Sequence, residues 1–185
     1  MAKLVWRHRV MICIEVVQAS SLDKGPIMLD PIRWRMADGR ILAAWAEGAA
    51  QLPGKLRLLD QTRLPEELVY LETDDLEEIF SAIQRLVVRG APAIGCAAAL
   101  GLAAVSQHVR CATPGEFLCA VRKIADQLRR SRPTAVNLFW ALDRCVARVE
   151  LTARQAGITP AALSEVLLRE GLAILAEYIT RCRAI

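Results

Sequence analysis

The sequence predicts an α+β fold that is mostly α, with a small antiparallel sheet followed by a helical bundle. Apolar residues recur at helical spacing in the segments after residue 73, whereas residues 28–72 contain short strand-like runs separated by turn residues. The 185-residue chain is 54% hydrophobic and only 5% aromatic, so its core must be built mainly from Ala, Leu, Val and Ile. We take this composition to favour helices.

Three parts are predicted along the chain. Residues 1–27 differ in character from the rest of the sequence, and we expect an extension of unknown role or a misplaced start before Met28. Residues 28–72 form a small β-rich part, in which PIRW, KLRLLD and ELVYLE are strand-like and an alanine-rich interlude is an insertion in one loop. Residues 73–185 form the helical part. Its last helix has no C-capping glycine, so we expect a truncated chain.

Five helices are expected in the helical part. The first has Thr73 as a possible N-cap and acidic residues in its first turn. The second, at 92–109, is nearly all Ala, Leu, Ile and Gly and must be buried on most sides. The third begins at TPGE, residues 113–116, and Pro133 opens the fourth. A break at 157–160 precedes the last helix.

The charge and hydropathy patterns exclude two classes of partner. The chain has 24 Lys and Arg against 20 Asp and Glu, a net charge of +4, and the basic residues are spread out instead of clustered. A nucleic-acid footprint needs such clustering. No apolar run approaches the ~18 residues of a membrane span. We therefore expect neither nucleic acid nor a membrane as a partner.

The cysteines and histidines predict no metal site. The six cysteines contain no CxxC pair, and the two histidines are not spaced as ligands with them. We expect ordinary reduced thiols in a cytoplasmic protein. The sequence also lacks GxGxxG and Walker motifs and a Ser/His/Asp set.

The segment VVRGAPAIG, residues 87–95, predicts an anion site. Proline suits the first turn of a helix, so Pro92 is expected to open one. Arg89 and Gly90 then precede the positive end of that helix. Free backbone N–H groups and a glycine without Cβ let an anion approach closely there. This is the layout of a phosphate site.

A second arginine stands before a proline in SRPT, residues 131–134. Each guanidinium would give a phosphate charge-assisted hydrogen bonds beside a helix N-terminus. Together, Arg89 and Arg132 would clamp a doubly charged phosphate. The alternative is that both motifs are only helix starts with solvated arginines, and the residues alone leave this open.

Several other polar and aromatic residues are expected to be structural. Trp34 and Trp140 are expected in the core or in an interface, and Asp143 and Arg144 in pairs with other helices. Asn137 lies one helical turn after the second arginine motif, and its spacing does not decide between the site and a neighbouring carbonyl.

Four motifs in order give the chain a resemblance to a known family. MLDPIRW, LLDQTRLP, VVRGAPAIGCAAALGLA and SRPTAVNLFWALDR resemble the N-terminal half of the S-methyl-5-thioribose-1-phosphate isomerases. The wider family includes ribose-1,5-bisphosphate isomerases and initiation factor 2B regulatory subunits. The resemblance covers about residues 28–185, although the stretch ILAAWAEGAAQLPGKLRL is longer than the usual link.

The resemblance implies a function and a set of binding residues. Carried over by motif, Arg89, Gly90, Ala91 and Arg132 would bind the substrate, a sugar phosphate. The family converts S-methyl-5-thioribose 1-phosphate to S-methyl-5-thioribulose 1-phosphate in methionine salvage, an aldose–ketose isomerisation without cofactor or obligatory metal. The resemblance also implies a homodimer in the full-length family.

The resemblance assigns no catalytic residue to this sequence. In the family a cysteine in a Thr-x-Cys-Asn segment and an aspartate act from a C-terminal Rossmann-like domain. Neither segment occurs here, and Cys182 belongs to the preceding helix, so we expect the chain alone to be inactive. Two alternatives stay open: a non-enzymatic regulatory or scaffold member of the family, and a ribose-1,5-bisphosphate isomerase.

Overall fold

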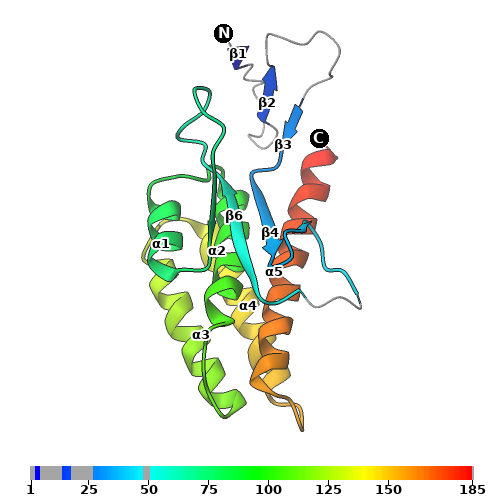
Figure 1. Cartoon of the computed structure of the whole chain (residues 1–185). Helices are drawn as coiled ribbons and strands as arrows, with labels where there is room; N and C mark the ends of the chain where they lie inside the picture. The colour runs from blue at the N-terminus through cyan, green and yellow to red at the C-terminus, as the bar shows by residue number, and fades with distance from the viewer. Residues whose placement is uncertain (1–2, 5–13, 18–26, 48–50, 185) are drawn as a thin grey trace.

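The computed structural model of the chain describes residues 3–4, 14–17, 27–47 and 51–184. The fold is α+β and mostly helical, as the sequence predicts, with strands stacked against a bundle of helices (Figure 1). The elements are β1 Lys3–Leu4, β2 Ile14–Val17, β3 Ile27–Leu29, β4 Ile32–Met36, β5 Ile41–Leu42, β6 Gly54–Leu59, β7 Tyr70–Thr73, α1 Leu76–Gln84, α2 Ala91–Ser106, α3 Pro114–Arg129, α4 Val136–Ala153 and α5 Pro160–Arg183.

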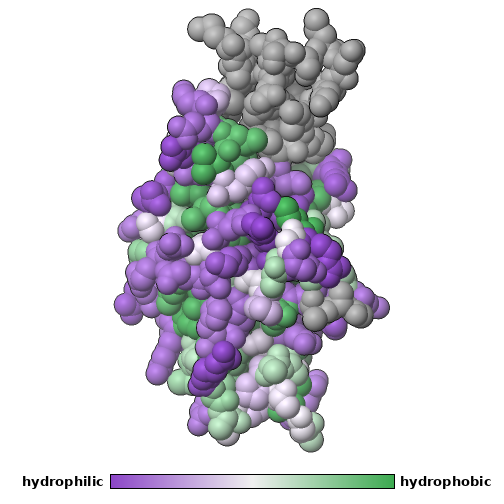
Figure 2. All heavy atoms as spheres, in the orientation of Figure 1, coloured by the Kyte–Doolittle hydropathy of each residue, from purple (hydrophilic) through white to green (hydrophobic). Residues whose placement is uncertain are grey.

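A four-stranded antiparallel sheet has the strand order β5-β4-β6-β7. In β4 the side chains of Ile32, Trp34 and Met36 are buried while the arginines between them are half-buried, because successive side chains point to opposite faces. The other face carries ion pairs such as that of Arg35 with Glu72. Figure 2 shows this side of the molecule covered largely by hydrophilic residues. The sheet therefore packs on the helices through one face only.

Helix α2 lies at the centre of the bundle. It packs against the four other helices and against β4 and β6, and nearly all of its side chains are buried. Alanine and glycine dominate its sequence, so neighbouring backbones approach it closely. The prediction that this helix is buried on most sides is confirmed. Its start is therefore held rigidly relative to the starts and ends of its neighbours.

Two helices begin close to the starts that the sequence predicts, and each has a threonine cap. Thr113 caps α3 in a capping box with Glu116, and the hydroxyl of Thr159 accepts from the N–H of Ala162 at the start of α5. Helix α1 is different: Asp75 is its N-cap, and Thr73 ends β7. The Thr73 hydroxyl accepts from the Asp75 N–H at 3.0 Å, so it supports the cap without being it.

The prediction that Pro133 opens a helix is wrong. Residues 132–135 form a turn in which the N–H of Ala135 donates to the carbonyl of Arg132 at 3.0 Å, and α4 begins only at Val136. Proline is favoured at the second position of a β-turn as well as in the first turn of a helix. The same residues are therefore compatible with a turn, and the helix begins after that turn.

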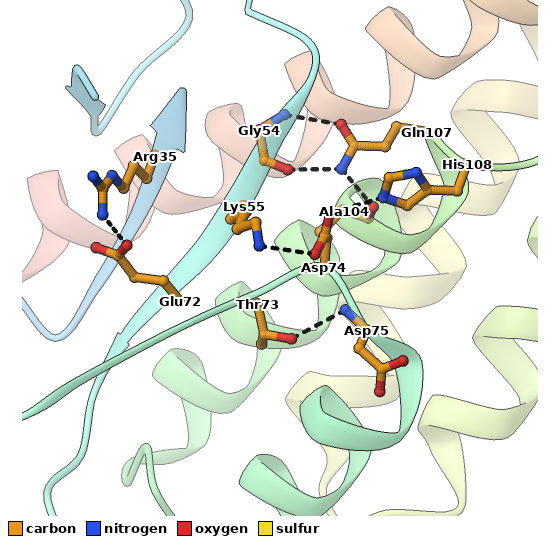
Figure 3. Close-up of polar contacts among 10 residues, drawn as sticks. All are labelled: Arg35, Gly54, Lys55, Glu72, Thr73, Asp74, Asp75, Ala104, Gln107 and His108. Carbon is orange, nitrogen blue, oxygen red and sulfur yellow. Dashed lines mark hydrogen bonds and ion pairs between the residues drawn. The ribbon is translucent and has the colours of Figure 1, made fainter. Parts of the chain in front are cut away.

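A polar seam joins the sheet to the end of α2 (Figure 3). The side-chain amide of Gln107 accepts from the N–H of Gly54 at 2.9 Å and donates to the carbonyl of Gly54 at 2.7 Å. Nearby, Asp74 contacts the ring of His108 at 2.8 Å and the ammonium of Lys55 at 3.5 Å. These contacts fix β6 and the β7–α1 link to the far end of α2.

The loop between β5 and β6 holds the alanine-rich interlude. Its described residues are anchored: Gln51 accepts through its backbone carbonyl from the Trp34 indole N–H at 3.0 Å, and Trp45 lies 4.6 Å from the Arg169 guanidinium. Trp34 is fully buried, as expected for a core residue. The predicted extension 1–27 lies mostly outside the described residues, and β1, β2 and β3 form a three-stranded antiparallel sheet.

Membrane spans and metal clusters are both absent from the described residues. No helix there is long and apolar enough to cross a membrane. No group of three or more His, Cys, Asp or Glu in the same ranges could hold a metal ion. The five cysteines placed by the structure are free thiols.

Candidate functional site

Backbone hydrogen bonds bring three of the four sequence motifs together. The N–H of Leu59 donates to the carbonyl of Pro31, and the N–H of Gln61 donates to the carbonyl of Val87, both at 2.9 Å. The segment LLDQTRLP is thus held between MLDPIRW and the arginine motif that follows Val87. Asp60 has a structural role, because its carboxylate accepts from the N–H and hydroxyl of Thr62.

The fourth motif joins the others through α4. The backbone of Gly95 in α2 packs on the backbone carbonyl of Asn137, in the first turn of α4. The segments containing Arg89 and Arg132 each end at one of these two adjacent helix starts. The structure therefore places both predicted arginine motifs at the same end of the bundle.

The segment Arg89-Gly90-Ala91 forms the entry to α2. Gly90 is the N-cap with φ +96° and ψ 129°, a conformation open to glycine and strained for other residues. Ala91 is the first helical residue and Pro92 the second, so the prediction that Pro92 opens a helix is confirmed to within one residue. No side chain caps this end of α2. Its backbone N–H groups thus keep the capacity to bind an anion.

Both arginines of the predicted anion site have side chains that are available to an external ligand. Arg89 is exposed and Arg132 is half-buried, and neither guanidinium has a hydrogen-bonded or ion-paired partner among the described residues. Arg144 and Arg148, by contrast, are held by carboxylates. An arginine without a carboxylate partner retains its full set of donors for an external anion.

A pocket of about 430 Å³ adjoins the arginine motifs. The start of α2, the start of α4 and the end of α5 meet around it. We call it the α2–α4–α5 pocket. It is lined by Pro92, Gly95, Cys96, Val136, Asn137, Trp140, Ile174, Glu177, Tyr178, Arg181 and Cys182.

Sequence reasoning missed Trp140 as a pocket residue. It was expected in the core or an interface, yet its side chain is 46% exposed and lines the pocket, and Val136 one turn earlier is 78% exposed. Two large apolar residues at positions i and i+4 share a face of a helix. That spacing at the beginning of α4, directly after the arginine motif, is the signal that could have found it.

An ion-pair cluster supports the wall of the pocket. Arg144 donates to both carboxylate oxygens of Glu177, at 2.9 and 2.7 Å, and to Glu170 at 2.6 Å. Glu170 is buried and also accepts from Arg148 at 2.8 Å. The hydrogen bonds from Arg144 lower the pKa of Glu177, in spite of its partial burial. The expectation that Arg144 pairs with another helix is confirmed.

The Cys96 thiol of the pocket is a poor nucleophile. Burial raises the pKa of Cys96 to about 12, with smaller contributions from nearby Cys182 and Glu177. A thiol with this pKa is neutral near pH 7, and the thiolate is the reactive form. Cys96 therefore serves as part of the pocket wall. The residues that line the pocket give it its shape and provide groups that can bind a ligand.

Comparisons with known proteins agree with the motifs. The profile of the Initiation factor 2 subunit family matches residues 87–185. The chain is 46% identical over 128 residues to a methylthioribose-1-phosphate isomerase of Pelotomaculum thermopropionicum. The aligned residues make up 69% of this chain and 34% of the relative. It is also 46% identical over 132 residues to a 5-deoxyribose 1-phosphate isomerase of Moorella thermoacetica, 71% of this chain and 37% of the relative. The chain thus spans about a third of the length of these curated relatives.

Two solved structures are similar in fold and sequence. One is 5-methylthioribose 1-phosphate isomerase from Pyrococcus horikoshii OT3, 36% identical with a TM-score of 0.62, over 66% of this chain and 34% of that one. The other is the delta subunit of translation initiation factor eIF-2B from A. fulgidus, 36% identical with a TM-score of 0.61, over 73% of this chain and 36% of that one.

Proposed function

The chain belongs to the Initiation factor 2 subunit family, and we propose that it binds a sugar 1-phosphate as part of a cytoplasmic aldose–ketose isomerase that acts on S-methyl-5-thioribose 1-phosphate. The observation that carries the proposal is a pair of arginines, Arg89 and Arg132, that have no partner in the described part of the chain and lie at one end of the bundle beside a pocket. Arg144, on the wall of the pocket, is by contrast paired with Glu170 and Glu177.

The phosphate is assigned to the entry of α2. There, Gly90 leaves room for an oxygen to reach the free N–H groups of the helix, and the two guanidinium groups provide the opposing charge. The sugar would then extend from Ala91 towards Gly95, along the first turn of the helix. In this arrangement the protein holds the sugar by its phosphate and so orients the ring. Orienting the substrate is the role of binding groups in a reaction confined to C1 and C2.

Two ionisable residues of the pocket lining, Cys96 and Glu177, are poorly suited to proton transfer. Moving hydrogen between C1 and C2 needs an acid or base whose pKa lies near the working pH. Cys96 stays protonated, and Glu177 stays ionised in its pair with Arg144. Neither Cys96 nor Glu177 therefore meets this requirement.

Binding of S-methyl-5-thioribose 1-phosphate to the purified chain, measured by calorimetry, tests the proposal. Arg89→Ala and Arg132→Ala should each weaken binding by about tenfold or more, because each removes hydrogen bonds to a charged group. Arg110→Ala is the matched control, since Arg110 is exposed beyond the opposite end of α2. Unchanged affinity in both test variants would refute the assigned site.

A regulatory role without a sugar ligand is the second candidate. The delta subunit of eIF-2B matches the chain as well as the isomerase does, with TM-scores of 0.61 and 0.62. This role predicts no binding heat with any sugar phosphate, and no effect of Arg89→Ala on assembly with other proteins. The same calorimetric series therefore separates the two candidates.

A further inference from the structure

The lining of the α2–α4–α5 pocket contains a carboxylate, although the pocket adjoins the site assigned to a phosphate. Glu177 of α5 is half-buried there, and its charge has the same sign as that of the proposed ligand. Salt screens the repulsion between partly buried charges less than that between exposed ones. Resting on the proposed function, we propose that Arg144 is a positioning residue that acts through Glu177. It neutralises this carboxylate, so that the pocket accepts an anionic ligand.

The contact between Arg144 and Glu177 is a bidentate ion pair. Nη1 of Arg144 donates to Oε2 of Glu177 at 2.9 Å, and Nη2 donates to Oε1 at 2.7 Å. Two parallel hydrogen bonds from one planar guanidinium are the strong and geometrically specific form of this interaction. Both carboxylate oxygens of Glu177 therefore accept from the protein, and the negative charge at the pocket is balanced by a group in direct contact with it.

A second arginine balances the other carboxylate of the cluster. Nε of Arg144 donates to Glu170 at 2.6 Å, and Glu170 is buried. The second oxygen of Glu170 accepts from Nε of Arg148 at 2.8 Å. Two guanidinium groups thus face two carboxylates, and the cluster as a whole has no net charge. A lysine at position 144 would lack the planar fork that contacts both glutamates at once.

The other polar groups near Glu177 do not replace Arg144. The hydrogen bonds from Arg144 are the main cause that lowers the pKa of Glu177, and the charge of Arg181, one turn later on α5, adds a smaller contribution. Arg181 is exposed, so solvent screens its charge. Cys96 of α2 is neutral near pH 7, because burial raises its pKa, and Asn137 of α4 has an uncharged amide.

The same ion pair joins the two helices that form this wall, α4 and α5. The Arg144 guanidinium lies 5.4 Å from the ring of Trp140, which lines the pocket one turn earlier on α4. Glu177 orients this guanidinium from the side of α5. A carboxylate in the wall of an anion pocket therefore has a structural use, and the bound arginine removes its electrostatic cost.

Calorimetric titration of S-methyl-5-thioribose 1-phosphate into the purified chain and its variants tests the inference. Arg144→Met leaves Glu177 with an unbalanced negative charge. Affinity should then fall by about tenfold, which corresponds to repulsion between like charges about 10 Å apart near a protein surface. Glu177→Gln leaves the cluster with an excess positive charge, so affinity should rise. The double variant restores the balance and should recover most of the affinity lost in Arg144→Met.

The signs of these effects separate charge neutralisation from a merely structural role. An ion pair that only stabilised the fold would weaken binding in both single variants, and the double variant would not recover. Either result overturns the inference. Where Arg144→Met does not fold, Glu177→Gln decides alone, because an unchanged or lower affinity contradicts the expected rise.

A second ion pair between helices provides the matched control. Arg122 of α3 donates to Glu150 of α4 at 2.8 Å, and neither residue lines the pocket. Arg122→Met should therefore leave the affinity unchanged, and a tenfold loss in this variant would also overturn the inference. No binding of any sugar phosphate by the wild type is a different result, because it overturns the proposed function and this inference together.

Discussion

A Cβ atom on Gly95 would lie 2.7 Å from the backbone carbonyl oxygen of Asn137, so α2 and α4 touch backbone to backbone at the edge of the pocket. No side chain separates the helices at this point. The distance between the two arginine motifs therefore depends on position 95 being a glycine, whose side chain is only a hydrogen atom.

Gly95→Ala is expected to destabilise the protein. The added methyl group meets rigid backbone, and overpacking of this kind costs about 1–3 kcal/mol. The midpoint of urea unfolding should fall accordingly. Gly115→Ala is the matched control, because a Cβ at Gly115 meets nothing within 4 Å. An equal effect of the two substitutions would contradict the close contact.

Gly90→Ala is expected to reduce stability and ligand binding together. At φ +96° an alanine is strained by about 1–3 kcal/mol, and its Cβ would also stand at the proposed anion site. Gly39→Ala provides the comparison, because Gly39 has φ +88° with open space around it. Calorimetry and urea unfolding of both variants should show similar destabilisation, with loss of sugar phosphate binding in Gly90→Ala alone.

Acid is expected to weaken the seam between the sheet and α2. Partial burial opposes ionisation of Asp74, but the hydrogen bond from His108 and the charge of Lys55 outweigh it and lower the pKa of Asp74. A carboxyl group with a lowered pKa stabilises the fold above its unfolded-state pKa, and this contribution is lost as pH falls through the folded-state pKa.

The variant Asp74→Asn measures this contribution. The Asp74 side chain is 27% exposed, so solvent screening limits the effect to about 1 kcal/mol or less. In urea unfolding the wild type should be the more stable protein at pH 7, and the difference should shrink between pH 5 and pH 3. A difference that stays constant across that range would exclude the ionised Asp74 as its source.

The helix starts could be predicted wherever the stop and start signals are local. Thr113 and Thr159 cap α3 and α5 through their own neighbours, so the sequence pattern and the structure agree. Pro133 was ambiguous because one proline suits both a β-turn and a first helical turn. In the structure the turn is closed by the bond from Ala135 to Arg132, and α4 begins at Val136.

The site could be predicted in its residues but not in its geometry. Local spacing indicated that Arg89 and Arg132 stand before helices, and the family resemblance supplied a ligand. The bond from Gln61 to Val87, which joins two of the motifs, links residues that local periodicity cannot connect. The spacing of Val136 and Trp140 indicated a shared apolar face, but it did not show that this face is left exposed in the structure.

The side chain of Gln107 substitutes for a strand. In an antiparallel ladder, a hydrogen-bonded pair exchanges both of its N–H and C=O groups, and the Gln107 amide makes this same exchange with Gly54 where β7 no longer reaches. A slip of β6 by one residue in one direction would present Pro53, which has no N–H to donate. The end of α2 thereby opposes a slip of the sheet in that direction.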